Sequence, residues 1–351
     1  MLDNFKTDEL EDQSVKYISG KKNVLVTGGA GFLGSNLCEI LVRNNNVICV
    51  DNYLTGQESN IDHLLQLPNF KFIKHDISEP LDLNESREAQ TFKVEFQGIQ
   101  EIYHAASPTH FDDNQKYPLE TSLANSLGTK NVLDWAVKHK GKVVIFSTSL
   151  VYGNLYGEQS IDETMMGITD PLGPRNCYIE GKRYAESLVD NYQIRYGLDT
   201  KIARIFNTYG PKMRASDNIL IPYFIDQALK NEPIEIKGTG EEMFSACYIS
   251  DILDGILKLM ASDERGPINL GSDNKVKLSD LAKKIVEISG STSVINYATS
   301  NEMTITRNIP NIALAKNKLE WMPVISLENG LRETIEDFKL SQKRVKTFSQ
   351  I

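Results

Sequence analysis

The sequence has few cysteines and no grouping of them that would hold a metal. Its four cysteines (Cys38, Cys49, Cys177 and Cys247) are scattered along 351 residues. Metal sites need short repeated spacings, and disulfide-stabilised secreted proteins are richer in cysteine. We therefore expect four reduced thiols, no metal and a cytoplasmic protein.

Long apolar runs and a surplus of positive charge are also absent. No run approaches the roughly 20 apolar residues of a membrane span, and residues 1–22 are too polar for a signal peptide. The formal net charge of -9 argues against a general nucleic-acid binder. An anionic small molecule remains possible, since a pocket can be locally positive. We expect no membrane and no nucleic-acid partner.

A glycine-rich segment follows the first apolar run. Residues 23–27 predict a strand, and glycines follow at Gly28, Gly31 and Gly34. We expect Gly28 to allow a tight turn, Gly31 to let the backbone approach a pyrophosphate, and Gly34 to allow close helix packing. A helical pattern then places five apolar residues on one face (Phe32, Leu33, Leu37, Ile40 and Leu41). Free N–H groups at the start of such a helix favour an anion.

An acid ends the second apolar run, which spans residues 47–50. Asp51 stands about where an acidic side chain accepts a hydrogen bond from a ribose 2′-hydroxyl. The same carboxylate repels a 2′-phosphate, so the sequence predicts NAD rather than NADP as cofactor, with Asn52 beside it.

Further strand-and-helix units predict an α/β protein with a doubly wound parallel sheet of the Rossmann type. Two of these strands end in residues that we expect at the cofactor: Asp76 and Ile77 after the third strand, and Ala105, Ala106 and Ser107 after the fourth. The fifth strand ends with the hydroxyl of Thr148 at the same edge, where ligands bind.

Tyr178 and Lys182 are four residues apart in the segment CYIEGKRYAES. On a helix that spacing puts both on one face. An ammonium beside a phenol favours the phenolate, so we expect Lys182 to lower the pKa of Tyr178 and to bind the nicotinamide ribose. Tyr178 would then be a general base for a sugar hydroxyl.

These motifs together resemble the extended short-chain dehydrogenase/reductases that act on nucleotide sugars. The resemblance rests on TGGAGFLG, Tyr178-x-x-x-Lys182 and STS-VYG, and covers roughly residues 21 to 340. GPRNCYIEGKR, ARIFNTYGP and YISDILDGI look most like UDP-glucuronate decarboxylases, with dTDP-glucose 4,6-dehydratases and UDP-sugar 4-epimerases further off.

The resemblance implies roles for several residues. Thr148 and Tyr178 would handle the C4 hydroxyl, and oxidation there by NAD would give a 4-keto sugar nucleotide. Asn125 holds the family's position for a residue that bends a helix near the site. The remaining expected substrate contacts are Ser149, Arg175, Asn207, the backbone of Ile236 and Gly238, Arg307 with a pyrophosphate, and Arg214 as a further candidate.

Two positions depart from the decarboxylase pattern. An acid follows the strand-end hydroxyls in decarboxylases and dehydratases, but Leu150 is here and cannot move a proton. Phe244 stands where decarboxylases have an arginine shortly before YxSD. Both changes remove groups that serve the step after oxidation. We therefore favour a 4-dehydrogenase, with 4-epimerisation, UDP-glucuronate decarboxylation and a non-catalytic NAD-binding module as alternatives.

The expected organisation has four parts. Residues 1–20 form an N-terminal arm, 21–206 the NAD-binding domain with Tyr178 and Lys182, 207–340 mainly a smaller nucleotide-sugar-binding α/β lobe, and 341–351 a tail. Helices are expected over 221–229 and 278–288. The helices with residues 125–136 and 178–196 have surplus apolar faces; in the family such helices form a dimer interface, which implies a homodimer.

Overall fold

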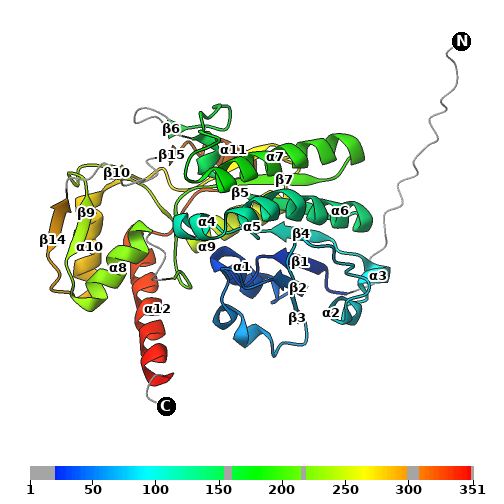
Figure 1. Cartoon of the computed structure of the whole chain (residues 1–351), viewed down its shortest axis with the longest axis horizontal. Coiled ribbons are helices and arrows are strands. Elements are labelled where there is room, and N and C mark those ends of the chain that lie inside the picture. The colour runs from blue at the N-terminus through cyan, green and yellow to red at the C-terminus, as the bar shows by residue number, and fades with distance from the viewer. Residues whose placement is uncertain (1–19, 154–159, 215–218, 299–307, 349–351) are drawn as a thin grey trace, which may run out of the picture.

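A seven-stranded sheet is the centre of the structure, a computed structural model that describes residues 20–153, 160–214, 219–298 and 308–348. The strand order is β12-β7-β5-β4-β1-β2-β3, and every pair is parallel (Figure 1). The order runs outward in both directions from β1, as a doubly wound sheet requires. This confirms the predicted α/β Rossmann-type fold.

The central strands are β1 (Asn23–Thr27), β2 (Asn46–Asp51), β3 (Phe70–Lys74), β4 (Glu101–His104), β5 (Lys142–Thr148), β7 (Thr200–Ile205) and β12 (Pro267–Leu270). The short strands are β6 (Ser160–Ile161), β8 (Thr208–Tyr209), β9 (Ile234–Lys237), β10 (Met243–Phe244), β11 (Cys247–Tyr248), β13 (Val276–Lys277), β14 (Ile295–Ala298) and β15 (Ile309–Pro310).

The helices are α1 (Phe32–Leu41), α2 (Arg87–Thr91), α3 (Val94–Gln97), α4 (Phe111–Lys116), α5 (Pro118–Leu123), α6 (Thr129–His139), α7 (Asn176–Tyr196), α8 (Leu220–Lys230), α9 (Ile249–Ala261), α10 (Leu278–Ser289), α11 (Ala313–Leu319) and α12 (Leu327–Phe348). Short 3-10 turns are η1 (Glu58–Asn60), η2 (Asp62–Leu64) and η4 (Ser149–Tyr152), and η3 (Ala124–Gly128) is a π-helical turn.

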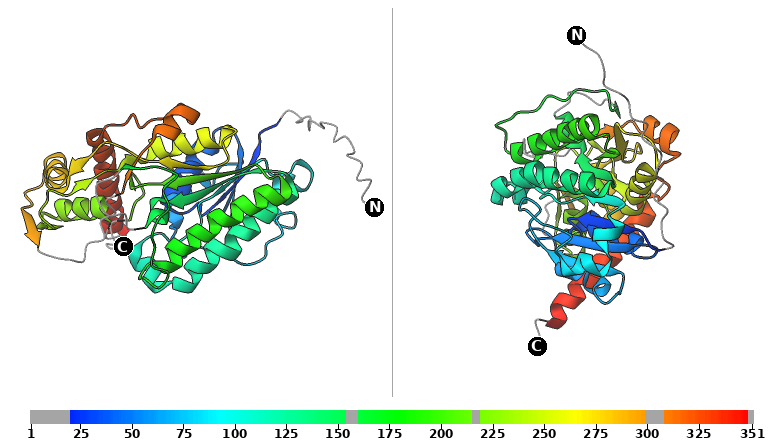
Figure 2. Two further views of the ribbon diagram at one scale, coloured as in Figure 1. Left: turned by 90° about the horizontal axis from the view of Figure 1, so that it is seen from above. Right: turned by 90° about the vertical axis from the view of Figure 1, so that its right-hand side faces the viewer.

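Helices cover both faces of the sheet, so its strands can be apolar throughout. All five residues of β1 are buried. α6 and α7 lie on one face, and α1 and α9 lie on the other (Figures 1 and 2). Each face has its own apolar core: Leu37, Ile252 and Trp321 belong to one, and Val132 and Val189 to the other.

A second lobe contains α8, α10 and α12 beside the two-stranded sheet of β9 and β14 (Figure 1). Its core includes Phe224, Leu281 and Leu331, each fully buried. α8 and α10 confirm the helices predicted over 221–229 and 278–288.

Two cations of the segment that follows β8 join this lobe to the first. Lys212 donates to Glu39 (2.5 Å) from its ammonium and to Asp337 (2.9 Å) from its backbone N–H. Arg214 donates to Asp113 (2.5 Å) and to the carbonyl of Thr55 (3.2 Å).

The chain returns to the first sheet after residue 206, since β12 forms its edge and α9 packs on β5 and β7. α12 extends to Phe348, so the tail expected from residue 341 begins inside a helix. The expected arm, residues 1–20, lies outside the described residues except for Gly20. In the part of the chain that is described, no helix is both long enough and apolar enough to cross a membrane.

Candidate active site

The turn between β1 and α1 is built from glycines that other residues could not replace. Gly28 has a φ of 73°, and a Cβ there would lie 2.6 Å from the Cα of Ala106. A Cβ on Gly34 would lie 2.1 Å from the carbonyl oxygen of Gly28. The tight turn and the close packing predicted for these two residues are therefore present.

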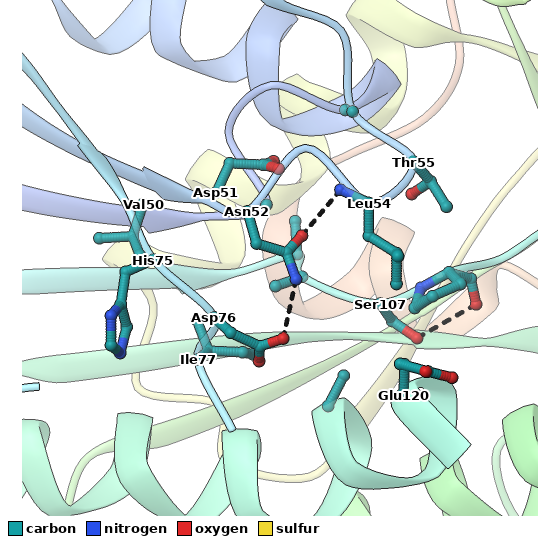
Figure 3. Close-up of a pocket in the computed structure, with 17 residues that line it drawn as sticks. Val50, Asp51, Asn52, Leu54, Thr55, His75, Asp76, Ile77, Ser107 and Glu120 are labelled. Carbon is teal, nitrogen blue, oxygen red and sulfur yellow. Dashed lines mark hydrogen bonds between the residues drawn. The ribbon is translucent and has the colours of Figure 1, made fainter. Parts of the chain in front are cut away.

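A pocket opens beside this turn, at the carboxyl ends of β1, β2, β3 and β4 (Figure 3). Ligands of doubly wound sheets bind at such an edge. The residues expected at the cofactor that line the pocket are Gly28, Gly31, Asp51, Asn52, Asp76, Ile77, Ala105, Ala106 and Ser107.

Hydrogen bonds fix the acids of the pocket. The carboxylate of Asp51 accepts from the backbone N–H groups of Ala30 (3.0 Å) and Tyr53 (2.8 Å). Burial nevertheless raises the pKa of Asp51, and these two bonds oppose the rise. Asn52 donates to Asp76 at 2.9 Å (Figure 3).

The pocket fits a dinucleotide with an unphosphorylated ribose. Gly31, the N-cap of α1, and Asp51 both line the pocket. The free N–H groups at the start of α1 suit a pyrophosphate, and the carboxylate of Asp51 suits a ribose hydroxyl.

Four expected cofactor residues are not on the pocket wall. Phe32 packs against two apolar cores, that of the central sheet and that of the second lobe. Leu33 packs against the core of the central sheet. Gly34 lies behind the turn, and Lys182 is buried beneath β5. Gly34 therefore supports the pocket from behind rather than lining it.

Sequence reasoning missed other lining residues, namely Val50, Leu54, Thr55, Gly56, His75, Pro108, Glu120 and Ala124. His75 directly precedes Asp76, so proximity along the chain could have found it. Glu120 comes from α5 and reaches the pocket only through the fold (Figure 3).

Asn125 lies in η3, the π-helical turn that joins α5 to α6. Its side chain is fully buried and donates to the carbonyl of Thr121 (2.8 Å) and to Ser107 Oγ (2.9 Å). The helix therefore departs from α geometry at Asn125, the residue expected to bend it. Asn125 also fixes Ser107, which lines the pocket.

Thr148 and Tyr178 are in hydrogen-bond contact, and Lys182 lies one turn along α7 from Tyr178. The ammonium of Lys182 is 5.9 Å from the centre of the Tyr178 ring and donates to the carbonyl of Phe146 at 2.7 Å. Thr148, Tyr178 and Lys182 are 8%, 5% and 4% exposed. The three residues proposed as catalytic are thus brought together at the end of β5.

Burial dominates the pKa of Tyr178, so the lowering expected from Lys182 stays a prediction. Burial raises the pKa of Tyr178, opposed by the charge of Arg175 and the hydrogen bond of Thr148. Lys182 is itself desolvated, which lowers its pKa to about 7, while the charge of Glu186 opposes that fall. Burial therefore moves the two pKa values in opposite directions, up for the phenol and down for the ammonium.

Arg175, one of the expected substrate residues, lies beside Tyr178. Its guanidinium is 5.6 Å from the centre of the Tyr178 ring and donates to the carbonyl of Thr109 at 2.8 Å. Its Nε is buried with no hydrogen-bond partner, so this side chain retains a donor beside the phenol.

The other expected substrate residues are already engaged within the protein. The carbonyl of Ser149 accepts from Asn308 (3.2 Å), and the side chain of Asn207 donates to the carbonyl of Ser245 (3.0 Å). Ile236 is fully buried in the second core, and the N–H of Gly238 pairs with Ala298 at 3.0 Å. The backbone N–H of Gly238 is therefore used by the β9–β14 sheet. Arg307 lies outside the described residues.

Leu150 and Phe244 differ in their surroundings. Leu150 is the second residue of η4 and is partly exposed, and its N–H donates to Thr148 Oγ1 at 3.3 Å. Phe244 is 5% exposed and belongs to the apolar core of the second lobe. Among the described residues, no group of His, Cys, Asp and Glu side chains could hold a metal ion.

His104 is a buried residue at the end of β4. Its Nδ1 is 2.7 Å from Thr27 Oγ1, and its Nε2 is 3.1 Å from Thr129 Oγ1. Thr129 donates its own hydroxyl proton to the carbonyl of Asn125, so Nε2–H is the donor to Thr129. Burial and the charge of Lys182 lower the pKa of His104 to about 3.

We expect His104 to make the fold sensitive to acid. Between about pH 6.5 and pH 3 the unfolded chain binds a proton here that the folded chain does not, so stability falls as pH falls. The free energy of unfolding, measured by urea unfolding across that range, should therefore change with pH. His104→Gln should reduce this slope by up to about 1.4 kcal/mol per pH unit. His63→Gln, at a half-exposed site, is the control and should keep the slope. An unchanged slope in His104→Gln would contradict this account.

Comparisons with known proteins agree with this geometry. UDP-glucuronic acid decarboxylase 6 of Arabidopsis thaliana is 37% identical over 328 residues, which cover 93% of this chain and 91% of that protein. An epimerase of Methanothermobacter thermautotrophicus has a TM-score of 0.81 and 26% identity, covering 93% of this chain and 95% of that one. UDP-glucuronic acid 4-epimerase of Bacillus cereus, solved with UDP-glucuronic acid and NAD, has a TM-score of 0.77 and 27% identity, covering 91% and 99%.

The relatives are nucleotide-sugar enzymes, and a solved neighbour contains NAD. The profile of one family matches residues 24–271, which span the pocket, the Tyr178–Lys182 pair and the whole central sheet. The chain belongs to the NAD dependent epimerase/dehydratase family.

Proposed function

We propose that this protein oxidises the C4 hydroxyl of a nucleotide-diphosphate sugar and stops at the 4-keto product. The observation that carries this proposal is a complete Thr148–Tyr178–Lys182 group next to a leucine, Leu150, that can move no proton. The apolar setting of Phe244 supports it, because that site offers no cation to a sugar carboxylate.

In this reaction the chain's own residues handle one proton. Tyr178, as phenolate, accepts the proton of the C4 hydroxyl, and Thr148 holds the oxygen that loses it. Lys182 favours the phenolate and holds the cofactor ribose. When bound, NAD accepts the hydride from C4, so that the alcohol loses two electrons and becomes a ketone. The residues proposed to hold the cofactor are Gly28, Gly31, Asp51, Asn52, Asp76, Ile77 and 105–107, with Gly34 supporting the turn from behind. Those proposed to hold the nucleotide sugar are Ser149, Arg175, Asn207, Ile236, Gly238 and Arg307.

A 4-epimerase is the second candidate, and the solved neighbours support it. They include UDP-glucose, UDP-N-acetylglucosamine and UDP-glucuronic acid 4-epimerases at 26–27% identity. An epimerase would return the hydride to the other face of C4 and needs no acid at position 150. The relatives named as decarboxylases support a third candidate, which Leu150 and Phe244 oppose.

The first experiment is mass spectrometry of sugar nucleotides after incubation with the purified protein and NAD. The panel contains UDP-glucuronate and several hexose and heptose nucleotides. Loss of two hydrogens with NADH formation is the expected result. Loss of carbon dioxide from UDP-glucuronate would overturn the proposal in favour of a decarboxylase. An unchanged mass with a new chromatographic peak would identify an epimerase, and tight NAD binding without turnover would identify a binding module.

The proposed assembly is a homodimer formed through α5, η3, α6 and α7. Four large apolar side chains of these elements are 43–75% exposed: Leu119, Leu123, Leu127 and Ile194. Exposed apolar side chains of this size favour a helical interface with a second copy.

A further inference from the structure

A buried ion pair lies directly behind the proposed catalytic residues. Glu186 is one turn beyond Lys182 on α7, and its carboxylate accepts from Arg204 Nε (3.0 Å) and Nη2 (2.7 Å). Ser147 Oγ also donates to it, at 2.5 Å. The two charged side chains are only 13% and 14% exposed. Such a bidentate pair fixes both position and orientation.

The arginine of this pair is also held by two other segments, one of which is itself bonded to β12. Its Nη1 donates to the hydroxyl of Tyr152 (2.9 Å) and to the carbonyl of Glu163 (3.2 Å). Tyr152 in turn donates to Asn269 on β12 at 2.7 Å. The ion pair and the groups bonded to it therefore join α7 to β5, β7 and β12 and fix the position of the Glu186 carboxylate.

Thr148 and Lys182 are both linked to the hydrogen bonds of Glu186 through adjacent residues of β5. Ser147 precedes Thr148, and Lys182 donates to the carbonyl of Phe146, which precedes Ser147. α7 thus reaches the end of β5 at two points one residue apart, through Lys182 and through Glu186.

Few charged or titratable groups face the Lys182 ammonium. Glu186 and Tyr178 come from its own helix, and His104 comes from β4 and is held neutral by burial. Arg204, on β7, approaches from the far side of Glu186. Glu186 is the group whose charge raises the pKa of Lys182 against the effect of burial.

We propose that Glu186 is a positioning residue that keeps Lys182 charged, and that Arg204 sets the strength of this effect by neutralising part of the Glu186 charge. The catalytic meaning of that charge rests on the proposed function. The electrostatic coupling itself does not, because it is a property of the folded chain without substrate.

Two substitutions should move the titration of Lys182 in opposite directions. Glu186→Gln removes the carboxylate charge, so Lys182 should lose its proton at a pH lower by about one unit. Arg204→Gln leaves the carboxylate unopposed, so Lys182 should lose its proton at a higher pH. A merely structural role predicts that both substitutions weaken the fold and that neither shifts the titration.

The titration can be followed by the pH dependence of unfolding, which needs no substrate. The unfolded chain binds a proton at Lys182 up to about pH 10.5, but the folded chain only up to about pH 7, so stability rises with pH between them. In Glu186→Gln the lower end of this window should move to lower pH, and in Arg204→Gln to higher pH. Both shifts should vanish in a Lys182→Met background.

Activity gives a second readout if the C4 oxidation is observed. The pH at which single-turnover NADH formation is half-maximal should shift in the same two directions. Identical unfolding profiles for Glu186→Gln and the unmodified chain, or a shift that persists in Lys182→Met, would overturn the proposal. If Glu186→Gln does not fold, Glu186→Asp is the substitute. It keeps the carboxylate charge but moves it one methylene back toward α7, so the titration of Lys182 should shift to lower pH by a smaller amount. Absence of turnover with every sugar would contradict the proposed function but leave the unfolding test intact.

Discussion

Tyr178→Phe should reduce NADH formation by about 10²–10⁴-fold, measured as single turnovers at saturating nucleotide sugar. The substitution removes the oxygen that accepts the C4 proton and the hydrogen bond with Thr148. The ring itself is 5% exposed, and phenylalanine fills the same space, so the fold should remain.

Tyr184→Phe is the matched control, because Tyr184 lies on the same helix and is 51% exposed. It should keep full activity. NAD binding should be the same in both variants, since Tyr178 is not on the pocket wall. Unchanged turnover in Tyr178→Phe would assign the proton transfer to another group.

Gly34→Ala should weaken NAD binding by about 100-fold or more, measured by titration calorimetry. The new Cβ would lie 2.1 Å from the carbonyl oxygen of Gly28 and 2.8 Å from the Cα of Gly29. Both neighbours are backbone and cannot turn aside, so the whole turn must move. That turn presents the N–H groups expected to bind the pyrophosphate.

Gly266→Ala makes the same chemical change where a Cβ meets no atom within 4 Å. It should leave both NAD affinity and Tm unchanged. Comparable affinities for the two variants would mean that the turn tolerates displacement and that the cofactor depends on other contacts.

The sequence predicts the glycine turn and much of the pocket wall, because these signals are local. Gly28, Gly34 and Asp51 lie within one β-α-β unit, where spacing along the chain determines spacing in the fold. Tyr178 and Lys182 lie on one helix, where a separation of four residues places them on the same face. The pocket residues Thr55 and Glu120 could not be found in this way, because they come from a loop and from a distant helix.

The pKa shifts of Tyr178 and Lys182 could not be predicted from the separation of the two residues along the chain. The pattern Tyr-x-x-x-Lys implies a charged lysine beside a phenol, but it carries no information about burial. Burial of Lys182 and Tyr178 depends on α7 packing against β5, and Glu186 acquires its partners from β5 and β7. The Ile236 and Gly238 contacts expected from the resemblance also depend on the β9–β14 pairing, which joins segments about 60 residues apart along the chain.

The position of β12 has a consequence for synthesis of the protein. Residues 267–270 form the outer strand of a sheet whose neighbouring strand is β7, residues 200–205. A nascent chain that has emerged only to residue 206 therefore presents β7 as an unprotected edge, with its hydrogen-bonding groups and apolar faces open to other chains. β12 and α9 must emerge before that edge is covered, so the first half of the chain depends on the second for its solubility during translation.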